Sequence, residues 1–442
     1  MNKQEILRPR ARIRGGVRLP HLKAAAEIET GRLPVPEQVI IPMVQHIGAP
    51  CTPLVKKGDP VFVGTKIGDS DAFVSAPIHS SVSGTVSEIK LISLPNGSEC
   101  QAVVILADGN QTPDPALKPV TVTTAEQLAA AARDCGLVGL GGAGFPTHIK
   151  LAPGKKIDTL IVNGAECEPF ITSDYRACME DGAELLSGIY LIQKLLNIEQ
   201  VIIAVENNKP AAIQKLYEIA ADKADAENRV KLMKLPARYP QGAEKVLIYS
   251  ATGRKLPAGK LPADVGCLVM NVTSIVILSI YLKTGMPLTQ KRITVDGNAV
   301  AERKNLFVPI GTPVCKVLEF CNAQDAQKVL LGGPMMGIAL ANPEQPLTKQ
   351  NNAVLAFCGK AAQTAEPTAC IRCGRCARVC PMRLTPAKVD AAVIPPDETL
   401  LQQQNVNYCM ECGCCAYMCP AHRPLVQSMR LAKNILKKAA KK

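Results

Sequence analysis

The chain has 442 residues, of which 47% are hydrophobic and 20% are charged. A chain of this length and composition is expected to form about three or four domains with buried cores, which argues against intrinsic disorder. The net charge of +13 permits nucleic-acid binding, but the chain has no Trp and 7 Phe, and it contains no nucleic-acid-reading motif, so this function is not expected.

The opening residues 1–16 are basic but lack the apolar stretch of a signal peptide, so export is not expected. The most apolar stretch, residues 267–282, is interrupted by Asn271, Thr273 and Ser274 and is shorter than the ~20 apolar residues of a membrane helix. The sequence therefore predicts a chain that does not cross a bilayer. Its 18 cysteines then indicate thiols that are kept reduced for metal binding.

Residues 39–90 contain short strand-like runs separated by turn residues, including Gly58-Asp59 and Gly68-Asp69. The pattern is similar to the barrel-sandwich of biotinyl and lipoyl carrier domains. Those domains carry a modified lysine at a hairpin tip, whereas we expect Ile78-His79-Ser80 at this tip, with His79 as an exposed turn residue. A structural or docking role is therefore favoured over a swinging arm.

The pattern changes to alternating helices and strands after residue 121. Thr124 is the expected N-cap of a helix that ends at Gly136, and a glycine-rich loop follows. Further strands are expected at 157–169, 200–206 and 231–235, and helices near 178–196 and at 209–225. This alternation predicts an α/β layer over about 120–265. Residues 290–340 predict a small α+β unit, and the chain beyond residue 361 is helical and rich in cysteine.

Eight cysteines near the C-terminus form two copies of the spacing C-x2-C-x2-C-x3-C-P, which is typical of proteins that bind two [4Fe–4S] clusters. Zinc sites and disulfide frameworks usually show other spacings. In such a doublet the fourth cysteine of each run completes the other run's cluster. The predicted ligand sets are Cys370, Cys373, Cys376 and Cys419 for one cluster, and Cys409, Cys412, Cys415 and Cys380 for the other.

The glycine-rich loop contains Gly139, Gly141, Gly142 and Gly144. Such a run lets the backbone approach a phosphate and direct several N–H groups at it. The loop follows a predicted helix instead of a strand, so it does not match a Rossmann fingerprint, and no Gly-Lys-Ser/Thr makes it a Walker loop. From these residues alone, a phosphate site and a tight packing turn remain equally open.

Four motifs occur in one order ahead of the cysteine doublet: GGAGFPTHIK at 141–150, NGAECEP at 163–169, YPQGAEK at 239–245, and the segment around Asn271. With the doublet, they resemble the RnfC family, a subunit of the Rnf ion-translocating ferredoxin:NAD oxidoreductases, over nearly the whole chain. The central part is similar to the flavoprotein subunit of respiratory complex I. The resemblance implies a multidomain α/β and α+β fold with four units: an N-terminal barrel-sandwich (1–115), an FMN- and NADH-binding α/β domain (116–265), a β-grasp, SLBB-like domain (266–350) and a helical double-cluster ferredoxin domain (355–442).

The resemblance also implies cofactor-binding residues, and none that is catalytic by itself. FMN would be held by Gly139, Gly141, Gly142, Gly144, Lys150, Asn163, Glu166 and Asn271. The nicotinamide nucleotide would contact Phe145, Glu168, Gly242 and Glu244. The chain departs from the flavoprotein pattern at Leu140, where that relative has an arginine, and at Ala165 and Ala243, where it has acidic residues; this leaves the pose of the nucleotide open.

Simpler interpretations stand beside these roles. Glu168 could be a solvated charge at a strand end, Glu244 a favourable acid at a helix start, and Asn163-Gly164 an ordinary turn. Cys167 lies between two glutamates, which would raise the pKa of its thiol, so a nucleophilic role is not expected.

The resemblance implies an oxidoreductase subunit that carries FMN and two [4Fe–4S] clusters and reacts with NADH or NAD. Its partners would be integral membrane subunits and a ferredoxin-like iron–sulfur subunit, and it would lie peripherally on the cytoplasmic side of the cell membrane. A soluble flavin and iron–sulfur reductase, such as the cobalamin reductases of microcompartments, is the main alternative, and a non-enzymatic relay is a third. The basic C-terminal segment 425–442 could lie on anionic lipid or pack on the cluster domain.

Overall fold

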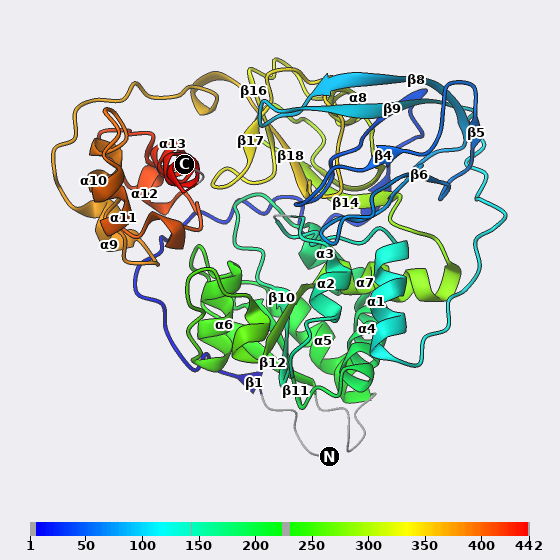
Figure 1. The fold of residues 1–442 in the computed structure, drawn as a ribbon, viewed down its shortest axis with the longest axis horizontal. Helices are drawn as coiled ribbons and strands as arrows, with labels where there is room; N and C mark the ends of the chain where they lie inside the picture. Colours follow the sequence, from blue (N-terminus) through cyan, green and yellow to red (C-terminus); the bar gives the residue numbers. More distant parts are fainter. Residues whose placement is uncertain (1–5, 143, 223–229, 441–442) are drawn as a thin grey trace.

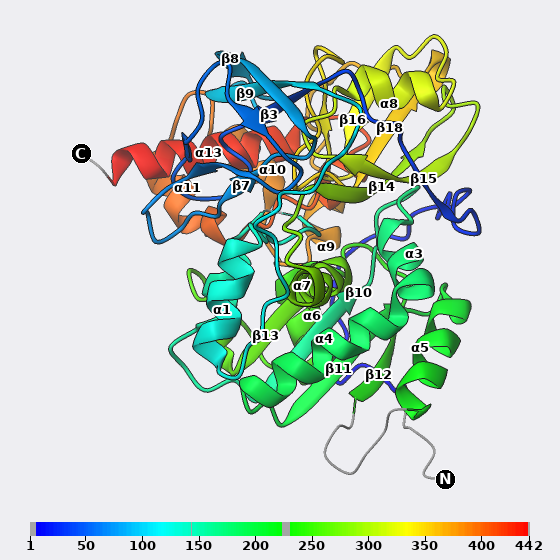
Figure 2. The same cartoon turned by 90° about the vertical axis from the view of Figure 1, so that its right-hand side faces the viewer.

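The computed structural model describes residues 6–142, 144–222 and 230–440. Figure 1 shows an α/β layer below, two β-rich units above it, and a helical, cysteine-rich unit to one side. The view turned by 90° in Figure 2 places the two β-rich units over the same end of the α/β layer. The predicted multidomain fold class is therefore confirmed.

The α/β layer contains a parallel sheet with the strand order β1-β12-β11-β10-β13. Runs such as VIIAV at 201–205 are continuously apolar, which is typical of parallel strands covered on both faces. The strands are β1 (Ile6–Leu7), β10 (Thr159–Gly164), β11 (Gln200–Glu206), β12 (Val230–Leu235) and β13 (Cys267–Asn271). Because β13 pairs with β10, this layer continues past residue 265.

Helices cover both faces of this sheet. They are α1 (Ala125–Asp134), α2 (Thr147–Leu151), α3 (Ser173–Glu180), α4 (Gly182–Leu195), α5 (Pro210–Asp222), α6 (Glu244–Thr252) and α7 (Val272–Thr284), and a short 3-10 turn, Pro262–Val265, precedes β13. Thr124 caps α1 as predicted, in a capping box with Gln127.

The helix expected near 178–196 corresponds to α4, but its predicted start is wrong, because α3 and α4 are separate and meet at Asp181-Gly182. Both residues favour the helix interior poorly, and Asp181 instead receives a 2.7 Å hydrogen bond from Arg292. The expected helix 209–225 corresponds to α5, and residues 223–225 lie outside the described part of the chain.

The barrel-sandwich consists of one sheet with the order β3-β9-β8-β5 and one with the order β4-β6-β7. Its strands are β3 (Gln38–Pro42), β4 (Thr52–Pro53), β5 (Pro60–Val61), β6 (Lys66–Asp69), β7 (Ile78–His79), β8 (Gly84–Ser93) and β9 (Glu99–Ala107). The expectation of an exposed His79 is wrong. The residue is only 5% exposed, because it pairs with Lys66 in β6 and packs below Gly136, where the glycine-rich loop begins.

The β-grasp unit has a mixed sheet with the order β17-β16-β18-β14-β15-β2, crossed by α8 (Val314–Phe320). Its strands are β2 (Thr30–Arg32), β14 (Gln290–Asp296), β15 (Lys304–Pro309), β16 (Lys328–Leu331), β17 (Ile338–Ala339) and β18 (Ala353–Phe357). Because β1 belongs to the α/β sheet and β2 to this one, the first part of the chain ties the two units together.

The cysteine-rich unit, the cluster domain below, is built from short helices around a small apolar core. They are α9 (Arg375–Val379), α10 (Pro386–Ala391), α11 (Glu398–Gln403), α12 (Cys414–Tyr417) and α13 (Leu425–Ala439), with 3-10 turns at Gly359–Ala361 and Val406–Tyr408. Helix α13 buries Leu425, Met429 and Ala432, so its apolar face packs on the cluster domain. Among the described residues, no helix combines the length and apolar character needed to cross a membrane.

Candidate functional site

The candidate cofactor site lies at the carboxyl ends of β10 and β13. The chain runs from β10 to β11 and β12 on one side and returns to place β13 on the other, so the strand order reverses between β10 and β13. Ligands of open α/β sheets bind in the crevice at such a point. Asn163 and Asn271 are paired in register at the ends of these two strands, which brings two predicted site residues together.

The glycine-rich loop closes on itself next to this crevice. Gly139 N–H donates to the Phe145 carbonyl at 2.8 Å, and Thr147 N–H donates to Leu137 at 3.0 Å. Gly141 and Gly142 are exposed at the tip, and a Cβ placed on Gly142 would meet no atom within 4 Å. This open space over bare backbone fits a phosphate or a flavin edge that approaches the loop closely.

Three further contacts draw predicted residues into the crevice. Lys150 Nζ in α2 lies 3.1 Å from Glu244 Oε1 at the start of α6 and donates to the Val269 carbonyl at 3.2 Å. Asn163 Nδ2 donates to the Gly242 carbonyl at 2.9 Å, so the interpretation of Asn163-Gly164 as an ordinary turn is wrong. The Lys150–Glu244 pair is partly exposed and can therefore exchange partners with a polar ligand.

Asn271 is the N-cap of α7, and its Oδ1 accepts from Thr273 N–H at 2.9 Å and Ser274 N–H at 3.3 Å. Its Nδ2 donates to Asp174 Oδ2 at 2.7 Å. A Cβ on Gly141 would lie 2.9 Å from this same nitrogen, so the loop tip rests directly on the Asn271 amide. A hydrogen bond from Asn271 to a cofactor would therefore have to share an amide that already has a partner.

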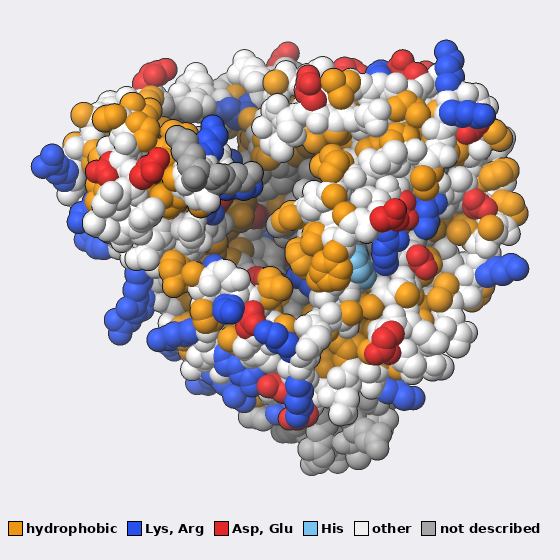
Figure 3. Space-filling model, viewed as in Figure 1, with side chains coloured by type: hydrophobic (Ala, Val, Ile, Leu, Met, Phe, Trp, Pro, Cys, Tyr) orange, Lys and Arg blue, Asp and Glu red, His pale blue; other side chains and the backbone are white. Residues whose placement is uncertain are grey.

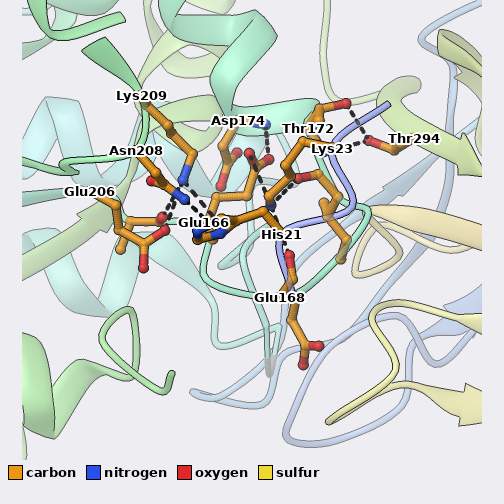
Figure 4. Close-up of polar contacts among 12 residues, drawn as sticks. His21, Lys23, Glu166, Glu168, Thr172, Asp174, Glu206, Asn208, Lys209 and Thr294 are labelled. Atoms are coloured by element: carbon orange, nitrogen blue, oxygen red, sulfur yellow. Dashed lines mark hydrogen bonds and ion pairs between the residues drawn. The ribbon is translucent and has the colours of Figure 1, made fainter. Parts of the chain in front are cut away.

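Glu166 lies in a buried group of charges, shown in Figure 4. Its Oε1 accepts from Asp174 N–H at 2.6 Å, and Lys23 Nζ lies 4.0 Å from Oε2. Lys23 also donates to the carbonyls of Glu166 and Glu168, at 3.0 and 2.8 Å. On the other side, Lys209 bonds Glu206 Oε2 at 2.9 Å and the Ala165 carbonyl at 2.8 Å.

Burial is the largest single cause of the pKa shifts in this group. It raises the pKa of Glu166 and lowers the pKa of Lys23. Burial also opposes the charge of Lys209, but Glu206 and Glu166 outweigh it, so the pKa of Lys209 is raised. The Glu166 backbone is held at a φ of 42°, which turns the chain sharply after β10. The group therefore fixes the shape of residues 165–168 from beneath the crevice.

Glu168 is not a solvated charge at a strand end. Its carboxylate accepts backbone N–H groups from Met335 at 3.0 Å and Met336 at 2.9 Å, in the turn between β16 and β17. Gly333 makes room for it, since a Cβ there would collide with the Glu168 carboxylate. Burial raises the pKa of Glu168 to about 7, although the two N–H groups lower it. Burial and Glu206 raise the pKa of Cys167 to about 12, which agrees with a non-nucleophilic thiol.

This carboxyl predicts a pH dependence of stability. Between its ordinary pKa of 4.5 and about 7, Glu168 holds a proton in the folded state that it has lost in the unfolded state. Its contribution to the free energy of unfolding is therefore complete below pH 4.5 and declines as the pH rises towards 7. We expect Glu168→Gln to flatten this decline, measured by denaturant unfolding at a series of pH values. Glu37→Gln, at an exposed site, is the control; a Glu168→Gln curve parallel to wild type would contradict the assignment.

In the cluster domain, one predicted set of cysteines surrounds a common space. A cavity is lined by all four cysteines of the second set, Cys380, Cys409, Cys412 and Cys415. Met382, Leu384, Met410 and Met429 also line it. Within the described residues, no three His, Cys, Asp or Glu side chains are arranged for a single metal ion. An apolar cavity ringed by four thiols suits a larger iron–sulfur cluster.

The first set is more open. Cys370 and Cys373 are exposed, Cys376 is buried in α9, and Cys419 is half-buried. Thr368 N–H donates to the Ala421 carbonyl at 2.9 Å, which joins the segments that lead to Cys370 and Cys419. The segments before Cys370 and after Cys419 therefore lie side by side, and the assignment of these four cysteines to one cluster stays a prediction.

The second set faces the α/β layer. Cys412 and Cys414 share a buried apolar cluster with Val17 and Tyr239, and Cys167 packs against it. Cys414 does not line the cavity, and its Sγ lies 4.0 Å from the Tyr239 carbonyl. Figure 3 shows a hollow between the cluster domain and the rest of the molecule on this side. The cavity of Cys412 thus adjoins the strand end that carries Glu166 and Glu168.

Several residues around the site have no signal in the sequence. Lys23, Asp174, Glu206 and Lys209 organise the strand end, yet none belongs to a recognisable motif. The two lysines reach partners far away in the chain: Lys23 and Glu166 are 143 residues apart, and Lys209 and Ala165 are 44 residues apart. A sequence pattern reports local spacing, so contacts of this kind escape it.

Three family models match successive parts of the chain. Residues 11–110 match the RnfC barrel sandwich hybrid domain, residues 132–279 the Nuo51 FMN-binding domain, and residues 363–420 a 4Fe-4S dicluster domain. The chain is 42% identical over 361 residues to the C subunit of the proton-translocating ferredoxin:NAD(+) oxidoreductase complex of Clostridium ljungdahlii, covering 80% of this chain and 78% of that protein. The chain belongs to the RnfC family.

Two further relatives from the RnfC family are also similar over most of the chain. The C subunit of the Na(+)-translocating ferredoxin:NAD(+) oxidoreductase complex of Acetobacterium woodii is 40% identical over 384 residues, which are 85% of this chain and 86% of that protein. The C subunit of the ion-translocating oxidoreductase complex of Rhodobacter capsulatus is 38% identical over 440 residues, which are 96% of this chain and 83% of that protein. The predicted resemblance is confirmed. The matches to the Nuo51 FMN-binding domain and to the 4Fe-4S dicluster domain confirm FMN and [4Fe–4S] clusters as cofactors.

Proposed function

We propose that this chain is the NAD(H)-linked, FMN- and iron–sulfur-containing subunit of a membrane-bound complex that couples electron transfer between ferredoxin and NAD to ion translocation. Its relatives are subunits of ion-translocating complexes, which favours this function over a soluble cobalamin reductase or a non-enzymatic relay. The chain would be peripheral, on the cytoplasmic side, with integral membrane subunits and a ferredoxin-like iron–sulfur subunit as its partners.

One observation carries the proposal. The buried cluster of Tyr239 and Cys412 joins the crevice at the strand ends to the cavity of four cysteines. A nucleotide-binding flavin site and an iron–sulfur site that adjoin in this way can exchange electrons without a mobile carrier. The exposed Cys370 and Cys373 lie in the other set, which makes that side the natural place for a redox partner to approach.

The chain's own residues bind, orient and shield. FMN supplies the step between two-electron hydride chemistry and one-electron transfer when it is bound. Gly141 and Gly142 would admit its phosphate or ring to the backbone, and Lys150 would supply a cation. Glu244 would exchange its bond to Lys150 for polar groups of the nucleotide, and Asn163 would hold the Gly242 segment in place. Cys380, Cys409, Cys412 and Cys415 would hold the nearer cluster, and Cys370, Cys373, Cys376 and Cys419 the outer one.

The test uses the full chain, reconstituted anaerobically with iron, sulfide and FMN. We expect about eight iron atoms per chain and reduction of the protein by NADH. Glu244→Ala is expected to raise the KM for NADH by roughly tenfold, since one charge-assisted hydrogen bond is lost.

The matched control is Glu126→Ala, which also removes an acid from the first turn of a helix. It should leave the KM unchanged if Glu244 acts on the nucleotide, and an equal KM for both variants would restore the interpretation of Glu244 as an ordinary helix-start acid. Bound zinc in place of iron, or no reaction with NADH, would overturn the proposed function.

A further inference from the structure

Two buried lysines of the β-grasp side of the molecule hold the glycine-rich loop. Lys291 in β14 is 4% exposed, and its Nζ donates to the Leu140 carbonyl at 2.7 Å and to the Lys349 carbonyl at 3.0 Å. Lys349 is 1% exposed, and its Nζ donates to the carbonyls of Gly136 at 2.7 Å and Pro77 at 2.6 Å. Lys349 thus holds the base of the loop at Gly136, and Lys291 holds Leu140, next to the loop tip.

These lysines are unusual in their partners. Among the residues that the structure describes, neither ammonium group forms an ion pair, and all four bonds go to neutral carbonyl oxygens. Burial lowers the pKa of Lys291 to about 7 and of Lys349 to about 8. An ammonium group without a counter-ion is costly to bury. A nearby anion that arrives on binding would offset that cost.

The bond from Lys291 also sets the direction of the loop backbone. In a trans peptide, the carbonyl of one residue and the N–H of the next point to opposite sides. Because the Leu140 carbonyl points inward to Lys291, the Gly141 N–H is turned away from Lys291. Gly141 is exposed at the loop tip, so a ligand can approach this peptide. The Gly144 carbonyl is held in a similar way by Ile47 N–H at 3.2 Å.

Lys291 also interacts electrostatically with the group of side chains behind the loop tip. Asp174 is the acidic group whose charge acts on Lys291, and it holds the Asn271 amide against which Gly141 rests. Lys291, Asp174 and Asn271 therefore form a polar support behind the loop tip, contributed by β14, α3 and β13. Lys291 is the member that brings a positive charge.

We propose that Lys291 is a positioning residue for FMN, which orients the Leu140–Gly141 peptide so that its amide faces the cofactor and places a buried positive charge behind it. This inference rests on the proposed function, because it takes the glycine-rich loop as the FMN site. It assigns to the β-grasp unit a part in flavin binding that its distance from the glycine motif in the sequence conceals.

The test compares FMN binding by the full chain, measured by quenching of flavin fluorescence, in wild type, Lys291→Met and Lys291→Gln. We expect the Kd for FMN to rise on the order of tenfold in Lys291→Met. The Leu140–Gly141 peptide then loses the charge-assisted hydrogen bond that orients it. Lys291→Gln keeps a donor without the charge, and we expect an intermediate Kd. It serves as the folded comparison if Lys291→Met does not fold. At pH 6 the flavin midpoint potential of Lys291→Gln is expected to become more negative, because a buried cation favours the electron-rich reduced flavin.

The matched control is Arg292→Met. Arg292 is the neighbouring buried cation of β14, but it pairs with Glu180 and Asp181, and none of its hydrogen bonds within the described part of the chain goes to the loop. It should lower the thermal stability and leave the FMN Kd within about twofold of wild type. Wild-type affinity and potential in both Lys291 variants would overturn the inference while the proposed function stands. A wild-type chain that does not bind FMN would overturn the proposed function, and this inference with it.

Discussion

Replacing Cys412 by serine is expected to remove one of the two iron–sulfur clusters and to stop electron flow out of the flavin site. Cys412 lines the four-cysteine cavity and also belongs to the buried contact with Tyr239, so it lies on the side nearest the flavin domain. An alcohol is a poor substitute for a thiolate ligand of iron. Iron should fall from about eight to about four atoms per chain, and NADH-driven reduction of the remaining cluster should slow by about 100-fold or more.

Cys414 provides a matched control for this experiment. It lies two residues away and is fully buried in the same apolar cluster, but it does not line the cavity. Cys414→Ser should keep about eight iron atoms and the wild-type rate of cluster reduction by NADH, followed by the electron paramagnetic resonance signal. Loss of half the iron in the Cys414 variant, with full occupancy in the Cys412 variant, would reverse the ligand assignment.

Gly136→Ala is expected to cause the largest loss of stability among single changes in the glycine-rich loop. Gly136 has a φ of +66°, and a Cβ there would lie 2.5 Å from the Pro77 carbonyl oxygen and 2.8 Å from Lys349 Nζ. The positive φ and the clash with backbone together should cost about 3 kcal/mol or more of unfolding free energy. Because the loop begins here, FMN binding should weaken as well. Denaturant unfolding and the FMN Kd check the two effects.

Gly154→Ala separates the two causes. Gly154 has a similar φ of +63°, but a Cβ there would meet nothing within 4 Å. It should therefore show only the cost of the backbone conformation, about 1 kcal/mol, and normal FMN binding. Equal losses in both variants would mean that the contact of Gly136 with the barrel-sandwich contributes nothing to stability.

The elements that the sequence predicted well are those whose signals are local. The apolar run of β11 and the cap of α1 at Thr124 depend on neighbours within a few residues. The strand expected at 157–169 is present as β10, but it ends at Gly164. The errors arose where a distant partner intervened. The helix expected at 178–196 is divided at Asp181, where Arg292 from β14 binds the side chain. His79 is buried because the α/β layer and Lys349 close over it.

In the candidate site, too, local motifs could be predicted from the sequence, whereas contacts between distant residues could not. The motifs that point to Asn163, Gly242 and Asn271 lie apart in the sequence, and the sheet brings them to one crevice. The roles of these residues, and of the eight cysteines as ligands, stay predictions until the experiments above are done. The structure adds two contacts that no motif contains: the carboxylate of Glu168 on the β16–β17 turn and the bond from Lys291 to the loop.

The sequence by itself determined which cysteines belong to the doublet, the order of the motifs and the family, because each depends on spacing along the covalent chain. The tertiary structure alone decided which groups meet across domains. Glu168 and Met335 are 167 residues apart, and Lys291 and Leu140 are 151 residues apart. Such pairs form only when whole layers pack, and burial then fixes both their hydrogen bonds and their pKa values.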